Sequence, residues 1–331
     1  MAFQLKKIIL LAAFAVTFSV SLFAQNSGRL EIVATDSTDM KQSKTAQGIV
    51  VELVNNVHLR QGDVEMFCEH VMWWKERNEV VIEQNVRIFD RLKKLYADYV
   101  FYYTDSRIYK ARGHVVLEDT ARKVFADEIQ YFREKDLIIA DGHVVVVDEE
   151  NDIEIRSRHA EVDNIKDYAL ITQDPIFVKK DSLGNEEIRI TGIKMELFGS
   201  SDKAVVTDSV KITHKDAIAT CGIAEFYQKE NRVLLKDTPI VLQKSDRLSG
   251  AEIELLLKEN NDLDKVIISG HGLVASQVDT TGKDKREHRL QGEKITMYFQ
   301  QRTHQNCQQP AIVRGRFLSC ENGAGFIGEK E

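Results

Sequence analysis

The sequence predicts an all-β protein, an elongated stack of antiparallel strands built from about eight related repeats. Three observations support this prediction. A unit of about 29 residues recurs along the chain, apolar and polar residues alternate inside it, and turn-forming residues separate its segments. The repeat is clearest between residues 86–113 and 115–142, where Val86, Ala97, Val100 and Tyr102 are matched 29 positions later by Val115, Ala126, Ile129 and Tyr131.

Each unit begins with two apolar residues separated by one position. A period of two with polar residues in between is typical of a strand that is buried on one face. Successive pairs begin 29, 29, 29, 32, 34 and 30 residues apart, and they are Val57/Leu59, Val86/Ile88, Val115/Leu117, Val144/Val146, Ile176/Val178, Val210/Ile212 and Ile240/Leu242. An eighth unit begins less regularly, near Gly272 and Val274.

A second strand in each unit is predicted from a small residue followed by apolar residues three and five positions later. These triplets are Cys68-Val71-Trp73, Ala97-Val100-Tyr102, Ala126-Ile129-Tyr131, Ser157-Ala160-Val162, Gly192-Met195-Leu197, Cys221-Ala224-Phe226, Gly250-Ile253-Leu255 and Gly292-Ile295-Met297. Residues 250–260 also permit a helix, but their place in the repeat favours a strand. Residues 181–185 (DSLGN) are typical of an extended hairpin tip.

The organisation of the chain follows from where the repeat starts and stops. Residues 1–24 have the features of a secretory signal peptide, because Lys6 and Lys7 precede a mainly apolar run that ends at Ala24. We expect cleavage after Ala24 and export, with a retained membrane anchor as the alternative. Residues 25–47 form a polar segment, 48–300 carry the repeats in two halves expected to meet near 172–176, and 301–331 form a C-terminal tail.

Composition argues against several classes of function. The net charge of −7 and the lack of a basic run argue against nucleic-acid binding. No spacing of Cys or His resembles a metal site, and the chain has no Gly-rich phosphate loop, Ser elbow or HExxH motif. We therefore predict no catalytic residues, no metal and no cofactor, and we expect that the protein is not an enzyme. An exported β-helical polysaccharide enzyme would need clustered acids on one exposed strand face, which the aligned units lack.

Two groups of polar residues are candidates for sites. His114, His143 and His271 each follow a glycine at one repeat position, which would suit a metal-binding ladder. Other units have Asn56, Asn85, Pro175 and Ser209 at the same position. That series indicates turn residues. The acidic run at 148–150 (DEE) is predicted to be a solvated loop between strands.

The four cysteines fall into two pairs. Cys68 and Cys221 occupy the small-residue position of the repeat, which favours buried small side chains over redox partners. Cys307 and Cys320 lie in the predicted C-terminal tail of an exported chain, and a disulfide between them is a candidate.

The apolar faces of stacked units should form one continuous lining, because a single unit cannot bury its own face. Several aromatic residues recur in this lining. Two interpretations are open. The aromatic residues fill a closed core, or the apolar faces of the stacked strands separate into a groove that holds apolar chains. The residues predicted to line such a groove are Val71, Trp73, Val86, Ile88, Val100, Tyr102, Val115, Leu117, Ile129, Tyr131, Val144, Val146, Phe226 and Leu255.

Three short patterns carry a resemblance to a known family. They are N-V-x-I/L, A-D-x-h-x-Y and h-x-A-x-G-H-V (h is apolar), seen in residues 85–88, 97–102 and 109–115. Together with the opening segment 48–63 (GIVVELVNNVHLRQGD), they resemble the OstA-like repeats of the LptA family of lipopolysaccharide-transport proteins. The resemblance extends over roughly residues 48–300.

The resemblance implies a β-jellyroll with an apolar interior that shields lipopolysaccharide acyl chains in transit through the periplasm to the outer membrane. It implies as partners lipopolysaccharide, through the acyl chains of lipid A, and other transport components whose jellyroll domains join end to end through terminal strands. Self-association through edge strands is a further expectation. The chain is longer than the small bridge protein of that family, which leaves open the component to which it corresponds. A structural β-solenoid scaffold without a lipid ligand is the alternative function.

Overall fold

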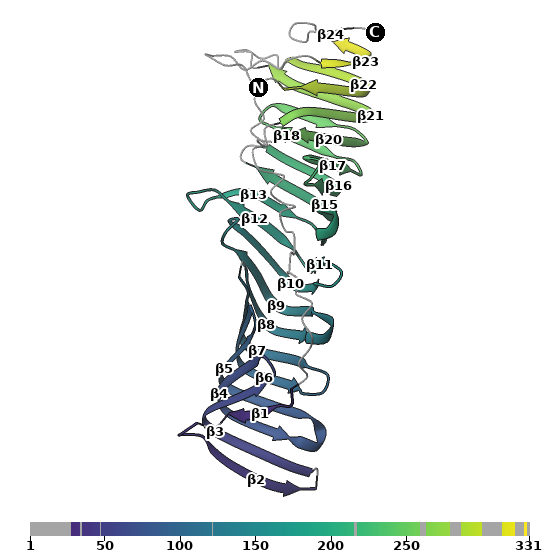
Figure 1. The fold of residues 1–331 in the computed structure, drawn as a ribbon. Coiled ribbons are helices and arrows are strands. Elements are labelled where there is room, and N and C mark those ends of the chain that lie inside the picture. The colour runs from purple at the N-terminus through teal and green to yellow at the C-terminus, as the bar shows by residue number, and fades with distance from the viewer. Residues whose placement is uncertain are drawn as a thin grey trace. The chain divides into compact units, whose positions relative to one another are not determined.

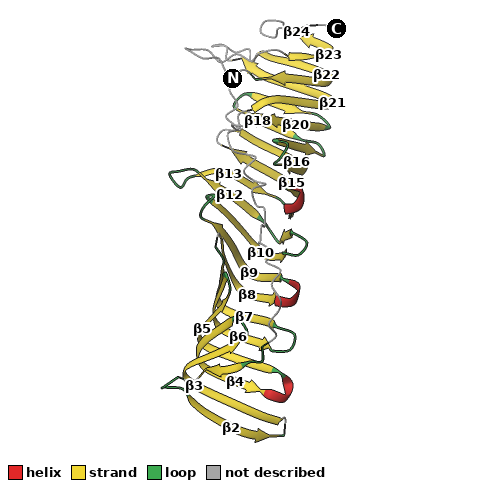
Figure 2. Cartoon of the chain, viewed as in Figure 1, coloured by secondary structure: helices red, strands yellow, loops and turns green. Residues whose placement is uncertain are grey.

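The computed structural model describes residues 28–33, 35–46, 48–120, 122–214, 217–258, 263–278, 286–299, 313–321 and 328–329 (Figure 1). The predicted signal peptide over 1–24 and Cys307 lie outside the described residues, as does the side chain of Cys320. The regular structure of the described part is 24 β-strands and three single-turn 3₁₀-helices, coloured red in Figure 2. The prediction of an all-β stack of antiparallel strands is therefore confirmed. No helix in these ranges is long and apolar enough to cross a membrane.

The chain divides into two compact units, the first ending at Pro175 and the second starting at Ile176. The elements of the N-terminal unit are β1 (Glu31–Val33), β2 (Asp39–Thr45), β3 (Gly48–Gln61), β4 (Val64–Trp74), η2 (Lys75–Arg77), β5 (Glu79–Asp90), β6 (Lys93–Tyr103), β7 (Ile108–Glu118), β8 (Arg122–Phe132), η3 (Arg133–Lys135), β9 (Leu137–Asp148), β10 (Ile153–Asp163) and β11 (Tyr168–Thr172). From β3 to β10 each strand pairs antiparallel with the next, and Figure 1 shows them following one another as hairpins.

The C-terminal unit is also built of strands, some only four to six residues long and others up to 16 residues long. Its elements are β12 (Ile176–Lys180), β13 (Glu186–Thr191), β14 (Lys194–Phe198), η4 (Gly199–Ser201), β15 (Lys203–His214), β16 (Ala217–Tyr227), β17 (Arg232–Lys236), β18 (Ile240–Gln243), β19 (Asp246–Ser249), β20 (Glu252–Leu257), β21 (Leu263–Val278), β22 (Arg286–Tyr298), β23 (Val313–Glu321) and β24 (Gly328–Glu329).

Several details of the sequence prediction can be compared with these bounds. The predicted hairpin tip at 181–185 joins β12 to β13, and Asp181 Oδ1 accepts hydrogen bonds from the backbone N–H groups of Leu183 and Asn185. The segment that also permitted a helix contains β20, a strand. The polar segment 25–47 contains β1 and β2, and the segment predicted to be a C-terminal tail contains β23, which pairs with β22.

A sharp corner divides each of the long strands β3, β5, β7 and β9. Two consecutive residues there have positive φ, and the strand pairing shifts at the same place. The pairs are Asn55–Asn56, Gln84–Asn85, Gly113–His114 and Gly142–His143. In the C-terminal unit, Asp208–Ser209, Asp237–Thr238 and Gly270–His271 are equivalent. This confirms that the Gly-His pairs are turn residues, although the turn is a corner within a strand and not a hairpin.

The residue types at the corners follow from backbone sterics. A left-handed conformation costs an ordinary L-residue roughly 1–2 kcal/mol, while Gly, Asn and Asp adopt it more easily. Gly113 has φ +75°, and a Cβ added to it would collide with the Asp98 carboxylate. Glycine at this corner therefore satisfies both the backbone conformation and the close approach of a neighbouring strand.

The corners split the N-terminal unit into two half-sheets. The first half-sheet contains residues 57–67, 86–96, 115–125 and 144–157, and the second contains 48–54, 70–83, 99–112, 128–141 and 159–172. Strand β1 extends the first half-sheet by pairing with residues 58–60, and β2 extends the second by pairing with 48–54. The apolar side chains of both half-sheets are buried between them, as the spacing of two predicted.

We expect that Asn85→Val lowers the free energy of unfolding by roughly 1–2 kcal/mol, because a β-branched residue is strained at φ +55°. Asn85→Gly is the matched control and should stay close to the wild type. Urea unfolding of both variants, followed by circular dichroism, measures the difference. Equal stability of the Val and Gly variants would contradict the proposed role of the corner.

Candidate functional site

The residues predicted to line a groove point into the N-terminal unit between its two half-sheets, apart from two that belong to the C-terminal unit. Most of them are buried: Val71, Val86, Ile88, Val100, Tyr102, Val115, Leu117, Ile129 and Val144. Trp73, Tyr131 and Val146 are half-buried. Phe226 and Leu255 are buried inside the C-terminal unit.

The two half-sheets face each other across a small apolar pocket. Ile88, Leu95 and Leu117 of the first half-sheet line one side, and Tyr109 and Tyr131 of the second line the other, with Asp90 and Lys93 completing the wall. The cavity volume is about 20 Å³, which is close to the space that one water molecule needs. The inward-facing side chains therefore pack against one another, and the interior is closed at this point.

Three tyrosines from neighbouring strands form a stack in the second half-sheet. The ring centroids of Tyr102 and Tyr109 are 4.3 Å apart, and those of Tyr109 and Tyr131 are 6.1 Å apart, with the rings near parallel in both pairs. Burial raises the pKa of all three phenols above the ordinary value. They therefore stay neutral at physiological pH and act as apolar surface with one polar end. The Tyr102 hydroxyl donates a hydrogen bond to Gln61 Oε1 in the first half-sheet.

The centre of the polar contacts between the half-sheets is Arg133, in η3. Its Nε lies 2.8 Å from Asp90 Oδ2, its Nη2 lies 3.0 Å from Asp90 Oδ1, and the same Nη2 lies 2.9 Å from Asp63 Oδ1. Only 13% of the Arg133 side chain and 12% of the Asp90 side chain are exposed. The hydrogen bonds that Arg133 donates to Asp90 raise the pKa of Arg133, so its guanidinium group stays charged in this bidentate pair although it is shielded from solvent.

Asp63 joins the same group of charges from the turn between β3 and β4. Its Oδ2 accepts a hydrogen bond of 2.6 Å from Arg91 Nε. Partial burial alone would raise the pKa of Asp63, but the Arg91 hydrogen bond and the Arg133 charge outweigh it and lower this pKa. Asp63 is 44% exposed, so it is the accessible member of the group.

Lys93 makes a second connection between the half-sheets. Its Nζ lies 2.6 Å from Asp136 Oδ1, 3.3 Å from the Tyr131 hydroxyl and 4.7 Å from the centre of the Tyr131 ring. A third connection runs from Gln61 Nε2 to the backbone oxygen of Thr104, at 3.4 Å. We call Gln61, Asp63, Asp90, Lys93, Arg133 and Asp136 the polar clasp. It joins the two half-sheets at strand ends, away from the corners.

The sequence prediction did not identify the polar clasp, although the repeat contains a signal for part of it. Two positions after each apolar pair, the alternation places another inward residue, and in the N-terminal unit it is polar each time: Gln61, Asp90, Asp119 and Asp148. A polar residue at an inward position of a strand requires a partner. The partner of Asp90 is Arg133, which lies on a turn two hairpins further along the chain, and the sequence pattern does not give that distance.

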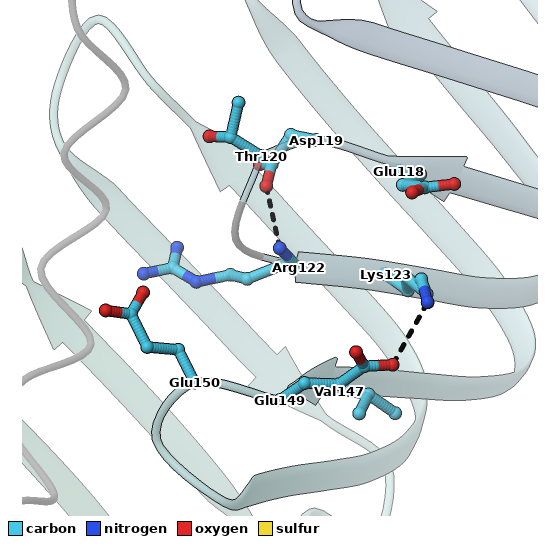
Figure 3. Close-up of a pocket in the computed structure, with 8 residues that line it drawn as sticks. All are labelled: Glu118, Asp119, Thr120, Arg122, Lys123, Val147, Glu149 and Glu150. Atoms are coloured by element: carbon cyan, nitrogen blue, oxygen red, sulfur yellow. Dashed lines mark hydrogen bonds and ion pairs between the residues drawn. The ribbon is translucent and has the colours of Figure 1, made fainter.

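A second pocket lies on the polar surface at the β7–β8 and β9–β10 turns, shown in Figure 3. Its volume is about 290 Å³, and its residues are Glu118, Asp119, Thr120, Arg122, Lys123, Val147, Glu149 and Glu150. Lys123 Nζ lies 3.0 Å from Glu149 Oε1, and the Arg122 backbone N–H donates to Asp119 Oδ1 at 2.8 Å. Charges of both signs are paired on an open surface here, which is typical of a solvated turn region.

The prediction for residues 148–150 is correct for Glu149 and Glu150, which are exposed, and wrong for Asp148. Asp148 is the last residue of β9 and only 1% exposed. It accepts hydrogen bonds from the backbone and the side chain of Asn151, and Arg122 Nε lies 3.6 Å away. The alternation of the strand turns its carboxylate inward, so it belongs to the interior and not to the loop.

The histidines that follow a glycine have acidic neighbours on the adjacent strand. His114 Nδ1 lies 2.7 Å from Asp98 Oδ2, and His143 Nδ1 lies 2.8 Å from Asp127 Oδ2. All four side chains are highly exposed. Among the described residues, no group of three or more His, Cys, Asp or Glu side chains could hold a metal ion. These contacts are therefore single pairs on the outer side of the corners.

Cys68 and Cys221 are free and buried, as their repeat position predicted. Burial raises the pKa of each thiol to about 12. Both side chains thus remain protonated at neutral pH and serve as small apolar residues.

Comparisons with known proteins give a family match and a distant structural likeness. Residues 28–193 match the model of a family described as OstA-like protein. No curated protein matches the chain. Seventeen chains of solved structures match. One is LptH from Pseudomonas aeruginosa, described as the LptA-homologous periplasmic component of the lipopolysaccharide transport device. It is 14% identical over 51% of this chain and 92% of its own length, with a TM-score of 0.20.

We expect that Arg133→Ala lowers the free energy of unfolding by about 2–4 kcal/mol, because Asp90 would keep a shielded charge without its partner. The matched control is Arg91→Ala, which removes an arginine that is 45% exposed from the same group and should cost less than about 1 kcal/mol. Chemical unfolding of both variants gives the two values. If both variants lost the same small amount, Arg133 would not be the centre of the polar clasp.

Proposed function

Because this chain belongs to the OstA-like family, we propose that it is a periplasmic carrier that shields the acyl chains of lipopolysaccharide on their way to the outer membrane. The observation that carries the proposal is the repeated apolar interior between two half-sheets. Each unit contributes the same kind of inward-facing residues, so the lining continues from hairpin to hairpin. Burying an acyl chain is worth about 0.8 kcal/mol for each CH₂ group, and an apolar path through the periplasm supplies that burial.

The proposed path requires the half-sheets to move apart, because the pocket between them has a volume of only about 20 Å³. Acyl chains would then replace part of the contact between the inner faces. The polar ends of Tyr102 and Tyr131 already lie at the polar clasp. Carbohydrate groups of the lipid would stay outside, where the clasp residues and the outer faces are polar.

Two strands at the N-terminal side support the proposal that the protein assembles end to end. Strand β1 extends the first half-sheet, and β2 extends the second. All seven residues of β2 are exposed, including Met40 at 62%. An edge strand of this kind pairs with a strand from another chain. We propose that its partner is the jellyroll domain of another lipopolysaccharide-transport component or a second copy of this chain.

The closed packing between the half-sheets favours a second candidate function, a structural periplasmic scaffold without a lipid ligand. In that case the tyrosine stack and the apolar residues around it would serve only as a core. The two functions differ in whether lipid reaches the interior, and a crosslinking experiment separates them.

We expect that a photo-crosslinking amino acid at Leu117, which is inward-facing and lines the apolar pocket, forms an adduct with lipopolysaccharide after incubation and irradiation. The control is the same amino acid at Phe125, a neighbouring aromatic residue that is 38% exposed, which should form little adduct. Gel mobility and immunoblotting for lipopolysaccharide detect the product. An absence of adducts at Leu117 in the folded variant would favour the scaffold.

We expect that a photo-crosslinker at Met40 on β2 links the protein to a second copy or to a partner jellyroll domain in an extract of the periplasm. A crosslinker at Leu92, equally exposed at 65% but on the turn between β5 and β6, is the control. Mass spectrometry of the products identifies the linked peptides. Equal crosslinking from both positions would argue against a specific edge-strand interface.

A further inference from the structure

The contacts of the polar clasp join parts of the chain that are far apart in sequence. Arg133 lies 43 residues from Asp90 and 70 residues from Asp63, and Lys93 lies 43 residues from Asp136. Each contact connects the first half-sheet to the second. The strand pairing, in contrast, runs within each half-sheet from hairpin to hairpin. Breaking the polar clasp would therefore leave the backbone ladders intact.

The polar clasp lies at the edge of the apolar pocket. Asp90 and Lys93 are the charged residues in the pocket wall, and the remaining wall is Ile88, Leu95, Leu117, Tyr109 and Tyr131. Asp90 is held by Arg133, and Lys93 is held by Asp136 and Tyr131. An apolar chain that enters the pocket from this side must first separate these pairs.

Positive and negative side chains are equal in number around this edge of the pocket, and the carboxylates are partners that another anion can replace. The cations Arg91, Lys93 and Arg133 face the carboxylates of Asp63, Asp90 and Asp136. A guanidinium group that binds a carboxylate with two parallel hydrogen bonds has the geometry to bind a phosphate group in the same way. A phosphorylated amphiphile can thus replace the carboxylates as the partner of Arg133 and Lys93. The same opening of the half-sheets exposes Asp90 and Asp136 to water, so neither carboxylate is left buried without a partner.

We propose that the polar clasp is a gate for phosphorylated lipids: Arg133 and Lys93 exchange Asp90 and Asp136 for headgroup phosphates as an acyl chain passes between the half-sheets. This inference rests on the proposed function as a lipid carrier. It adds to that function the opening through which lipid passes and the residues that bind the headgroup. A clasp that lay outside the path of the lipid would not accelerate lipid uptake when weakened.

The test measures the rate at which a photo-crosslinker at Leu117 captures purified lipid A, in the full chain. Asp63→Asn removes the accessible carboxylate of the polar clasp, and we expect capture to become roughly fivefold faster, equivalent to about 1 kcal/mol. Glu128→Gln is the matched control, because Glu128 pairs with Arg112 at 2.7 Å outside the polar clasp. Its capture rate should equal that of the wild type.

A second variant and a second lipid complete the test. Asp136→Asn removes the carboxylate that binds Lys93 and should also accelerate capture of lipid A. This variant keeps the proposal testable if Asp63→Asn does not fold. Dephosphorylated lipid A should be captured more slowly than phosphorylated lipid A by the wild type, and Arg133→Gln should remove that difference.

Three results would each overturn a different part of the proposal: the carrier function, the gate or the binding of headgroup phosphates. No capture of either lipid by any folded variant would overturn the carrier function itself. Capture by the wild type that neither Asp63→Asn nor Asp136→Asn accelerates relative to Glu128→Gln would overturn the gate while leaving the carrier function intact. Equal capture of phosphorylated and dephosphorylated lipid A by the wild type would overturn the assignment of Arg133 and Lys93 to headgroup phosphates.

Discussion

The arrangement of the N-terminal unit depends on one backbone constraint, the pair of left-handed residues in the middle of each long strand. A strand without such a pair would continue straight and place all its apolar side chains on one open face. The pair turns the chain so that the two parts of the strand face each other, and the apolar sides are then buried between them. Because the pair recurs about every 29 residues, all corners lie on one side of this unit. The strand ends on the other side are held by the polar clasp.

This arrangement determines where polar groups are tolerated in the interior. At the corner the backbone is exposed, and residues such as His114 and Asp98 interact in solvent. At the opposite side the strand ends of both half-sheets come together, and inward positions there carry charge. Asp90 is acceptable at such a position because Arg133 offers it two hydrogen bonds, whereas an unpaired carboxylate there would be costly. The tyrosine stack lies between these polar contacts and the apolar interior.

The sequence contains enough information for the fold class and for the inward residues, because both depend on local periodicity. A spacing of two assigns Val86, Ile88 and Val100 to the interior, and they are buried. The residue types at the corners indicate turns, but they do not reveal a strand that bends between two half-sheets. Asp148 resembles a loop residue because it precedes two acidic residues, although its place in the alternation turns it inward. The contacts of Arg133 could not be predicted, since they join turns 43 and 70 residues apart that only the packing of one half-sheet on the other brings together.

A closed interior is compatible with a carrier function if lipid replaces most of the interactions that break when the half-sheets move apart. The hydrogen bonds of the strand ladders run within each half-sheet, so a rotation of the half-sheets about the row of corners would preserve them. Such a rotation would break the ion pairs of the polar clasp and separate the apolar inner faces. An acyl chain restores apolar packing to the inner faces, and a phosphate group restores a partner to the cations of the clasp. The same closed packing keeps the apolar faces out of water when no lipid is bound, which a permanently open groove would not do.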